Sequence, residues 1–456
     1  MRPGRLLRRS VKANARRLGR GGRSLASLII AGLVCAAVPS ARQGGAVRAL
    51  ASPRCQALDA ATFVDSLGVN THLSWPGTPY SDLERVTEEL NYLGIRNLRD
   101  DFALNPLGYA AVEAMMARGF RFDLISGPDL QPFLSAVRRL RLAHPAGLLA
   151  IEGPNEVDGW AIKHDGRSGI PAAIRYQQDL FRAIRADPTL GGVPVYNLSV
   201  AAVGASHGLG DLSPFADRAN VHIYYGAGQP AYGWSPGDRA HHWASWLDSG
   251  RLAARGRPLV VTETGSSATP AWGGGVDEAT QARQILNSLM DAARTGVSGV
   301  YLYELVDGMN NGPQDEKSHY GLFRWDRSPR PAALAIHNLV RILRGDPRVP
   351  PKDRSGAVDY SIEGTPPWGG CLLFERPDGA KAIAVWAEPD IWDERSRTPI
   401  APPDVPVTIR LSRASQVAVY DPLLSARPVR STAARTEITV HLTDHPVIVE
   451  IGAASR

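Results

Sequence analysis

The chain has 456 residues, of which 44% are hydrophobic and 21% are charged, so it can bury a large core. Its formal net charge is +6, yet residues 1–50 hold ten Arg, Lys12 and no acidic residue. Without these 11 cations the chain has 40 Lys and Arg and 45 Asp and Glu, which gives a net charge near −5. This balance argues against a nucleic-acid partner, because such proteins carry a basic patch on their folded part.

The first 51 residues have the pattern of an export leader. Basic residues between 2 and 23 precede an apolar run at 25–38, and Ala49-Leu50-Ala51 resembles a cleavage site. We therefore expect a secreted, periplasmic or cell-envelope protein. The run of 14 residues is shorter than the roughly 20 that span a membrane, so a membrane contact is expected only if the leader stays uncleaved. The Arg8-Arg9 pair raises the twin-arginine route, although it lies far from the apolar run.

From about residue 66, short apolar segments alternate with amphipathic ones. Strands are predicted at 67–73, 95–99, 122–126, 148–152, 195–200, 220–225, 259–263 and 299–305. Helices are predicted at 81–93, 107–118, 132–142, 170–186, 239–255, 278–295 and 331–344, with no clear helix after residue 200. Eight strands, each followed by a crossover, predict an α/β fold, a (β/α)8 TIM barrel, over residues 52–345. The alternative is an open doubly wound sheet, but residues 70–75 lack its Gly-rich phosphate turn.

The pattern becomes β-like after residue 345. Pro347, Pro350 and Pro351 mark a boundary, and strands are predicted at 371–376, 382–387, 405–411, 416–421, 437–442 and 446–451. Residues 346–456 are therefore predicted to form an all-β sandwich module. Outside the leader the chain has two cysteines, Cys55 and Cys371, which either form a disulfide in an oxidising compartment or remain free thiols. The absence of a CxxC motif or a His/Cys cluster predicts no structural zinc site.

Chemically useful side chains follow the predicted strands, at the barrel face where active sites form. They are His72 and Trp75, then Arg99, Asn155 and Glu156, then His222 and Tyr224, and finally Glu263 and Glu304. Glu156 and Glu263 suit glycosidic cleavage, which needs one acid to protonate the leaving oxygen and one carboxylate to meet the oxocarbenium-like carbon. Glu152 is expected to be a buried, paired structural acid.

Asn155-Glu156 after the fourth strand, with Glu263 after the seventh, resembles the clan A glycoside hydrolases. Residues 319–323 and 329–332 look like the strand-eight-to-helix-eight passage of families 5 and 39. The resemblance implies retention, with Glu156 as acid/base, Glu263 as nucleophile, and no metal or cofactor. It also implies that Asn155 binds the sugar 2-hydroxyl.

Two further positions match the clan pattern. Arg99 corresponds to its strand-two arginine, and His222-Ile223-Tyr224 to its strand-six His-x-Tyr, whose tyrosine hydrogen-bonds the nucleophile. Glu304 departs from the pattern, because many members place a sugar-stacking Trp at the end of strand eight. Two roles stay open for Glu304: a contact with sugar hydroxyls, or the nucleophile role in place of Glu263.

The remaining predicted contacts concern substrate binding. His72 is either a sugar ligand or a hydrogen-bonded core histidine. Some of the tryptophans in the expected active-face loops should stack on sugars: Trp75, Trp160, Trp234, Trp272 and Trp325. The function expected is a retaining glycoside hydrolase acting on an oligo- or polysaccharide. The alternatives are an inactive exported carbohydrate-binding barrel and a transglycosylase at the same site. A β-linkage is favoured and an α-arabinofuranoside stays open, while the oligomeric state is not specified.

Overall fold

The structure is a computed structural model that describes residues 55–101, 106–235, 238, 240–345 and 358–452. Residues 51–456 form one compact unit. The predicted leader and the prolines at 347, 350 and 351 lie outside the described residues. Among the described residues, no helix is both long enough and apolar enough to cross a membrane.

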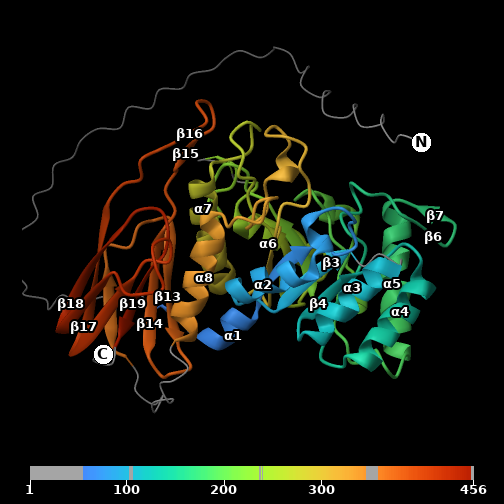
Figure 1. Cartoon of the computed structure of the whole chain (residues 1–456), viewed down its shortest axis with the longest axis horizontal. Coiled ribbons are helices and arrows are strands. Elements are labelled where there is room, and N and C mark those ends of the chain that lie inside the picture. Colours follow the sequence, from blue (N-terminus) through green and yellow to red (C-terminus); the bar gives the residue numbers. More distant parts are fainter. Residues whose placement is uncertain (1–54, 102–105, 236–237, 239, 346–357, 453–456) are drawn as a thin grey trace, which may run out of the picture. The chain divides into compact units, whose positions relative to one another are not determined.

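Eight parallel strands form the barrel (Figure 1). They are β2 (Leu67–Thr71), β3 (Asn97–Asp101), β4 (Arg121–Ile125), β5 (Leu148–Glu152), β8 (Val195–Tyr196), β9 (Ala219–Ile223), β10 (Leu259–Thr264) and β11 (Val300–Leu302). Their order is β8-β5-β4-β3-β2-β11-β10-β9, and a parallel bridge between Tyr196 and Arg218 joins the two ends of the series. The predicted (β/α)8 barrel is therefore confirmed.

The helices alternate with these strands, as the crossover pattern predicts. They are α1 (Ala60–Asp65), α2 (Leu83–Leu93), α3 (Pro106–Ala117), α4 (Leu130–Ala143), α5 (Ile170–Ala186), α6 (Trp243–Ala253), α7 (Glu278–Thr295) and α8 (Pro331–Arg344). The stretch after β8 contains two short 3-10 turns, Ala205–Gly208 and Ser213–Phe215. A strand was predicted at 195–200, but the observed strand β8 ends at Tyr196.

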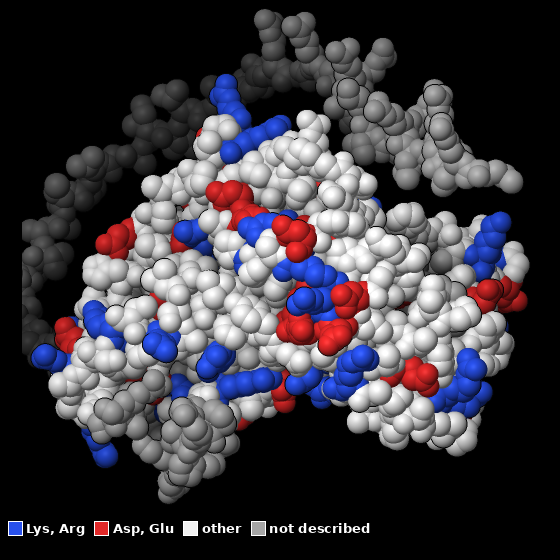
Figure 2. Space-filling model, in the orientation of Figure 1, with Lys and Arg blue, Asp and Glu red and all other residues white. Residues whose placement is uncertain are grey.

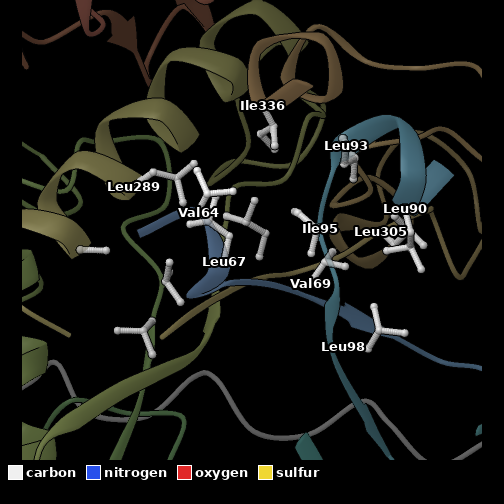
Figure 3. Close-up of a cluster of buried hydrophobic side chains, with 14 of the residues drawn as sticks. Val64, Leu67, Val69, Leu90, Leu93, Ile95, Leu98, Leu289, Leu305 and Ile336 are labelled. Atoms are coloured by element: carbon white, nitrogen blue, oxygen red, sulfur yellow. The ribbon is translucent and has the colours of Figure 1, made fainter. Parts of the chain in front are cut away.

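Apolar side chains from strands and helices meet in the layer between them (Figure 3). Val69 on β2 and Leu98 on β3 are fully buried, as are Leu90 and Leu93 on α2. The period of each element places these residues on one face, so burying that face drives the helices onto the barrel. On the face of the molecule shown in Figure 2, basic and acidic side chains are interspersed.

The C-terminal part is a mixed β-sheet that folds over its own core. Its strands are β12 (Tyr360–Glu363), β13 (Gly369–Glu375), β14 (Lys381–Ala387), β17 (Val405–Tyr420), β18 (Arg430–Leu442) and β19 (Val447–Ile451). β17 is one continuous strand where two were predicted, and its pairing with β18 is irregular between Arg410 and Ser415. Two small hairpins lie outside this sheet: β6 (Lys163–His164) with β7 (Arg167–Ser168), and β15 (Trp392–Asp393) with β16 (Thr398–Pro399).

β14 shows how this sheet is attached to the barrel. Ile383 and Val385 face the core of the C-terminal part, whereas Ala384 and Trp386 belong to the cluster that includes the barrel core. Successive side chains of a strand point to opposite faces, so β14 is buried on both sides. On the barrel side, Phe63 of α1 packs against Phe374 of β13, with their ring centroids 5.3 Å apart. The barrel and the sheet therefore share apolar core.

The first described strand, β1 (Gln56–Asp59), belongs to the C-terminal sheet, where it pairs in parallel with β13. The barrel was predicted to begin at residue 52, but β1 lies inside that range and belongs to the C-terminal sheet. Local sequence could not show this, because the partner of β1 lies more than 300 residues along the chain.

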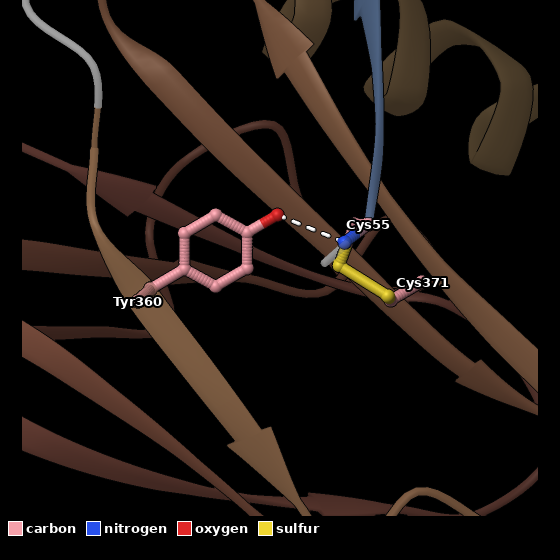
Figure 4. The surroundings of a disulfide bond; sticks show 3 residues. All are labelled: Cys55, Tyr360 and Cys371. Carbon is pink, nitrogen blue, oxygen red and sulfur yellow. Dashed lines mark hydrogen bonds between the residues drawn. A yellow bond between two sulfur atoms is a disulfide. The ribbon is translucent and has the colours of Figure 1, made fainter. Parts of the chain in front are cut away.

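A disulfide joins Cys55 to Cys371 and fixes this pairing (Figure 4). The Cys55 amide also donates a hydrogen bond to the Tyr360 hydroxyl at 3.0 Å. The bond closes a loop of 316 residues in the unfolded chain, and long loops lose the most entropy when they are closed.

Replacing Cys371 with Ser should lower the unfolding free energy by roughly 2–5 kcal/mol, because the unfolded chain regains the freedom that the bond removes. Urea unfolding of the variant and of the wild type, with and without reductant, measures the change. Reduced wild type should unfold at the same urea concentration as the variant. Equal midpoints for the oxidised wild type and Cys371→Ser would contradict a stabilising bond.

Candidate active site

Two glutamates meet at the carboxyl ends of the barrel strands. Glu263 is the second-to-last residue of β10, and Glu156 follows the end of β5 by four residues. One carboxylate oxygen of each lies within 4.8 Å of the other. Glu263 is 8% exposed and Glu156 is half-buried. The structure thus brings together the two residues that sequence predicted to act as a pair.

The backbone of Glu156 is held in an unusual conformation. Its φ is +43°, in the left-handed region that costs a non-glycine residue on the order of 1–3 kcal/mol. Its amide donates to Ser199 Oγ at 3.0 Å, and that hydroxyl lies 3.4 Å from Asn155 Oδ1. Ser199 therefore fixes the turn that carries both Asn155 and Glu156.

Arg99 is the cation at the centre of the site, and it is 1% exposed. It donates two hydrogen bonds of 2.7 Å to Glu152 and one of 2.6 Å to Glu263 Oε1. Further N–H groups reach Asn70 Oδ1 at 2.8 Å and Asn155 Oδ1 at 2.7 Å. The planar guanidinium thus aligns side chains from several strands, which a lysine ammonium would not do. Glu152 is the buried, paired acid that was predicted.

The surroundings of Glu263 favour its ionised form. Burial alone would raise its pKa, but the charges of His222 and Arg99 and a hydrogen bond from Tyr224 outweigh burial and lower it. Tyr224 donates to Glu263 Oε2 at 2.7 Å. Burial, followed by the charge of Glu263, raises the pKa of Tyr224 well above its ordinary value, so the phenol keeps the proton that it donates. Glu263 therefore stands as a carboxylate with both oxygens oriented.

His222 lies beneath the two glutamates. It is fully buried, and its Nδ1 lies 2.9 Å from Glu156 Oε1 and 3.6 Å from Glu263 Oε2. Its Nε2 lies 3.4 Å from the Arg99 guanidinium. Burial lowers the pKa of His222, but the charge of Glu263 and the hydrogen bond with Glu156 outweigh it and raise the pKa, which favours the imidazolium, whose Nδ1–H donates to Glu156. The structure gives His222 a positioning role for Glu156. Arg99 and Tyr224 likewise position Glu263.

The Glu304 carboxylate is buried and hydrogen-bonded by other residues of the protein. It is 1% exposed, and it accepts hydrogen bonds from the Tyr80 hydroxyl at 3.0 Å and the Gly308 amide at 3.3 Å. Burial raises its pKa to about 7, although His72 opposes that shift. Neither predicted role fits a carboxylate held in this way. The structure places Glu304 as a support for the loop after β11.

His72 and Trp75 form a stacked pair beside Glu304. Their ring centroids are 4.0 Å apart, and Trp75 Nε1 donates to Asp101 Oδ2 at 3.3 Å. His72 lies 3.5 Å from Asp101 and 3.4 Å from Glu304. Burial lowers the pKa of His72, but the hydrogen bond to Asp101 and the charges of Glu304 and Asp101 outweigh it and raise the pKa to about 9. These contacts fit the alternative that His72 is a paired core histidine.

Sequence reasoning missed three supporting residues. Asn70 accepts from Arg99, and its amide donates to the carbonyl of Thr262 at 3.0 Å. Ser199 holds the turn of Glu156. Asp123 is fully buried, and burial followed by the charge of Glu152 raises its pKa well above its usual range. For Asn70 and Asp123 the available signal was a polar residue inside a strand of an otherwise apolar barrel.

A cavity of about 320 Å³ lies against Tyr224. Its described lining residues are Ala201, Tyr224, Gly226, Ala227, Trp234, Trp246, Gly265, Ser266, Ser267, Trp272, Gly274, Tyr320 and Glu394. Trp234 and Trp272 were among the predicted stacking residues, and both reach this cavity. Trp160 is 60% exposed with the Lys317 ammonium 6.0 Å from its ring centroid, and neither Trp160 nor Trp325 is among the described lining residues.

Glu156, His222 and Glu263 supply donor atoms within 4.8 Å of one another, a set that could hold a metal ion. Both oxygens of Glu263 already accept hydrogen bonds, and the His222 Nδ1 hydrogen is shared with Glu156. A divalent cation here would also lie beside the buried Arg99 guanidinium and be repelled by it. These side chains fit a proton-transfer site better than a metal centre. The absence of a metal stays a prediction.

Several solved structures resemble this chain in fold. A family 39 glycoside hydrolase from Bacteroides cellulosilyticus WH2 has a TM-score of 0.59 at 13% identity, over 86% of this chain and 82% of its own. A monomeric β-xylosidase from Caulobacter crescentus CB15 has a TM-score of 0.56 at 16% identity, over 89% and 98%. The family 39 enzyme from Xanthomonas axonopodis pv. citri has a TM-score of 0.55 at 15% identity, over 90% and 100%.

No protein-family model and no curated protein matches the sequence. At identities this low the likeness establishes the fold alone, a (β/α)8 barrel with a C-terminal β-module. The predicted resemblance to family 39 is confirmed at that level.

Arg99→Met should lower the unfolding free energy by about 3–5 kcal/mol, because Glu152 and Glu263 would keep buried charge without a partner. Arg99→Lys should recover only part of this loss. Urea unfolding measures both variants. The control is Arg410→Met, an exposed arginine on β17 paired with Glu363 and Glu437, which should change stability little. A loss no larger than the control's would contradict a central role for Arg99.

His72→Gln should flatten the fall in stability between pH 7 and pH 9.5. The folded-state pKa of His72 is raised to about 9, so its contribution is complete below the unfolded value of 6.5 and disappears as pH rises through 9. Wild type should therefore lose on the order of 2 kcal/mol more than the variant over this window. Thermal unfolding across the pH series measures it. Glu304, whose pKa is about 7, titrates mainly below this pH window and so contributes little to the change in stability across it. Parallel curves would refute the assignment.

Proposed function

We propose that the protein is a retaining glycoside hydrolase that cleaves O-glycosidic bonds of an oligo- or polysaccharide. The observation that carries the proposal is the distance between the two carboxylates: one oxygen of Glu156 lies within 4.8 Å of one oxygen of Glu263. Retaining enzymes separate their carboxyl groups by about 5–5.5 Å, whereas inverting enzymes need about 6.5–9.5 Å to admit a water. The fold shared with family 39 enzymes supports the same proposal.

In the first step Glu263 attacks the anomeric carbon while Glu156 gives its proton to the leaving oxygen. The glycosidic C–O bond breaks, an ester bond to Glu263 forms, and the leaving sugar departs with the proton. In the second step Glu156, now a carboxylate, takes a proton from water, which attacks the same carbon and releases Glu263. Two displacements restore the original anomeric configuration.

The supporting residues suit these unequal roles. Arg99 and Tyr224 keep Glu263 ionised and aimed before the attack, and they stabilise it again as a leaving group. His222 shares its Nδ1 hydrogen with Glu156 and holds that carboxyl group beside the reacting bond. Asn155, whose oxygen is fixed by Arg99, can turn its amide hydrogens towards a sugar hydroxyl. The site needs no cofactor for this chemistry.

The protein is also proposed to act outside the cytoplasm. The leader pattern in residues 1–51 supports this location, and so does the Cys55–Cys371 disulfide, because such bonds persist in oxidising compartments. An inactive carbohydrate-binding barrel fits less well, because it has no use for a nucleophile held ionised beside a second carboxyl group.

Glu263→Gln should lower kcat on aryl glycosides by about 10⁴-fold or more, since the carboxylate that forms the covalent intermediate is lost. Glu156→Ala should lower it by about 10²–10⁴-fold on poor leaving groups and less on activated ones. Glu84→Gln, an exposed glutamate in the first turn of α2, is the control and should keep wild-type kinetics. Wild-type turnover in both site variants would refute the assignment.

Proton NMR of the first-formed product should show the anomeric configuration of the substrate. Azide should restore turnover of Glu156→Ala and yield a glycosyl azide of retained configuration, because the intermediate forms but lacks a base for water. An inverted first product would contradict the retaining mechanism while leaving hydrolysis intact. Transfer to added sugar in place of water would mark the enzyme as a transglycosylase.

A further inference from the structure

The segment between β14 and β17 leaves the C-terminal sheet and reaches the barrel loops that follow β9 and β10. Near its start, Glu388 Oε2 accepts from the Ala231 amide at 2.9 Å, and Asp390 Oδ1 accepts from the Tyr232 hydroxyl at 3.3 Å. The Pro389 carbonyl accepts from Gln229 at 3.3 Å. These contacts hold the base of the segment on the loop after β9.

The hairpin β15–β16 continues this attachment (Figure 1). Trp392 is 3% exposed and packs with Ala227 from the loop after β9 and Val276 from the loop after β10. Arg397 donates to the Ala271 carbonyl at 3.1 Å. The hairpin is therefore fixed to both loops by apolar burial and hydrogen bonds, and it holds its turn residues in place on the active face.

Glu394, in the turn of this hairpin, lines the cavity beside Tyr224. Tyr224 also holds the nucleophile Glu263, so the cavity adjoins the reacting centre. Glu394 is the one charged side chain among the described residues that line the cavity. The Glu394 side chain is exposed, and within the described chain no cation is paired with it. Desolvation, followed by the charge of Asp390, raises its pKa.

The other walls of the cavity are aromatic or small. Trp234 and Trp272 offer flat apolar faces, which suit the C–H faces of a sugar ring, and Ser266 and Ser267 lie between them and the barrel. A carboxylate in such a site accepts charge-assisted hydrogen bonds from sugar hydroxyls. It also repels a second carboxylate. About 320 Å³ lies at the small end of ligand pockets, which suits a short piece of a sugar chain.

We propose that Glu394, delivered by the C-terminal module, is a specificity residue that binds hydroxyls of an uncharged sugar unit in this cavity and excludes uronic acids. This inference rests on the proposed glycosidase function, and it adds the chemical class of the substrate. It also makes the C-terminal module a component of the substrate site, because the barrel alone supplies no charged group to this cavity within the described residues.

The first test compares kcat and KM on para-nitrophenyl β-D-glucoside, β-D-xyloside and β-D-glucuronide. The glucoside and the glucuronide differ only at C6, where the glucuronide carries a carboxylate. Wild type should prefer the glucoside. Glu394→Gln should raise KM for the neutral substrates by about tenfold, with little change in kcat, because one or two charged hydrogen bonds are lost. Glu394→Lys should shift the glucoside-to-glucuronide ratio of kcat/KM towards the glucuronide by about tenfold or more.

Glu437→Gln is the matched control, an exposed glutamate on β18 of the same module. It should leave all three sets of constants unchanged. Unaltered KM values and an unaltered glucoside-to-glucuronide ratio in both Glu394 variants would overturn the proposal. Loss of kcat with KM unchanged would do so as well, because it would place Glu394 in the chemical step.

A binding test separates this inference from the proposed function. Three tryptophans line the cavity, so methyl β-D-glucoside and methyl β-D-xyloside should quench tryptophan fluorescence saturably, and methyl β-D-glucuronide should bind at least tenfold more weakly. Glu394→Gln should weaken the neutral ligands. Saturable binding with this selectivity but no turnover of any glycoside would refute the proposed glycosidase function and support the sugar site at Glu394. Turnover without selective binding, or binding that is unchanged in Glu394→Gln, would refute the sugar site at Glu394 and leave the proposed glycosidase function standing.

Discussion

The site depends on one buried cation. Arg99 is 1% exposed, and its N–H groups reach acceptors on Glu152, Glu263, Asn70 and Asn155, which come from several strands and the turn after one of them. Moving a guanidinium out of water is costly, and only charged acceptors with good geometry offset that cost. The barrel strands must therefore end in register around this group. The same contacts that neutralise Arg99 also determine where the nucleophile points, so the stability of the fold and the geometry of the reaction have a common origin.

The C-terminal sheet is a structural necessity for this barrel. β14 buries one face in its own module and the other against the barrel, so removing the module would expose apolar surface on the barrel side. The module also carries the hairpin that ends at the active face. One shared core thus supports two functions of the module: it covers the barrel's flank, and it contributes to the substrate cavity.

Much of the framework could be predicted from local sequence. The bounds of α5, α7 and α8 were predicted as observed, because Pro171 and Pro331 mark helix starts and the Asp277 cap and Gly296, at φ +68°, bound α7. The pair Glu156 and Glu263 was predictable because both follow apolar strands. What failed depends on distant partners. No local pattern pairs β1 with β13, brings Glu394 to Tyr224, or shows that Glu304 is enclosed by Tyr80 and His72.

The pairing of β1 with β13 has a consequence for how the chain reaches its native state. Residues 56–59 are among the first of the described chain to be made, yet their partners, residues 372–375, are made only after the whole barrel. Contacts this far apart in sequence form late, because the entropy of closing the loop must be overcome first. The intervening strands and helices can assemble sooner from neighbouring pieces. The N-terminal edge of the C-terminal sheet can thus be completed only after the whole barrel has been synthesised, and β1 pairs later than the barrel strands.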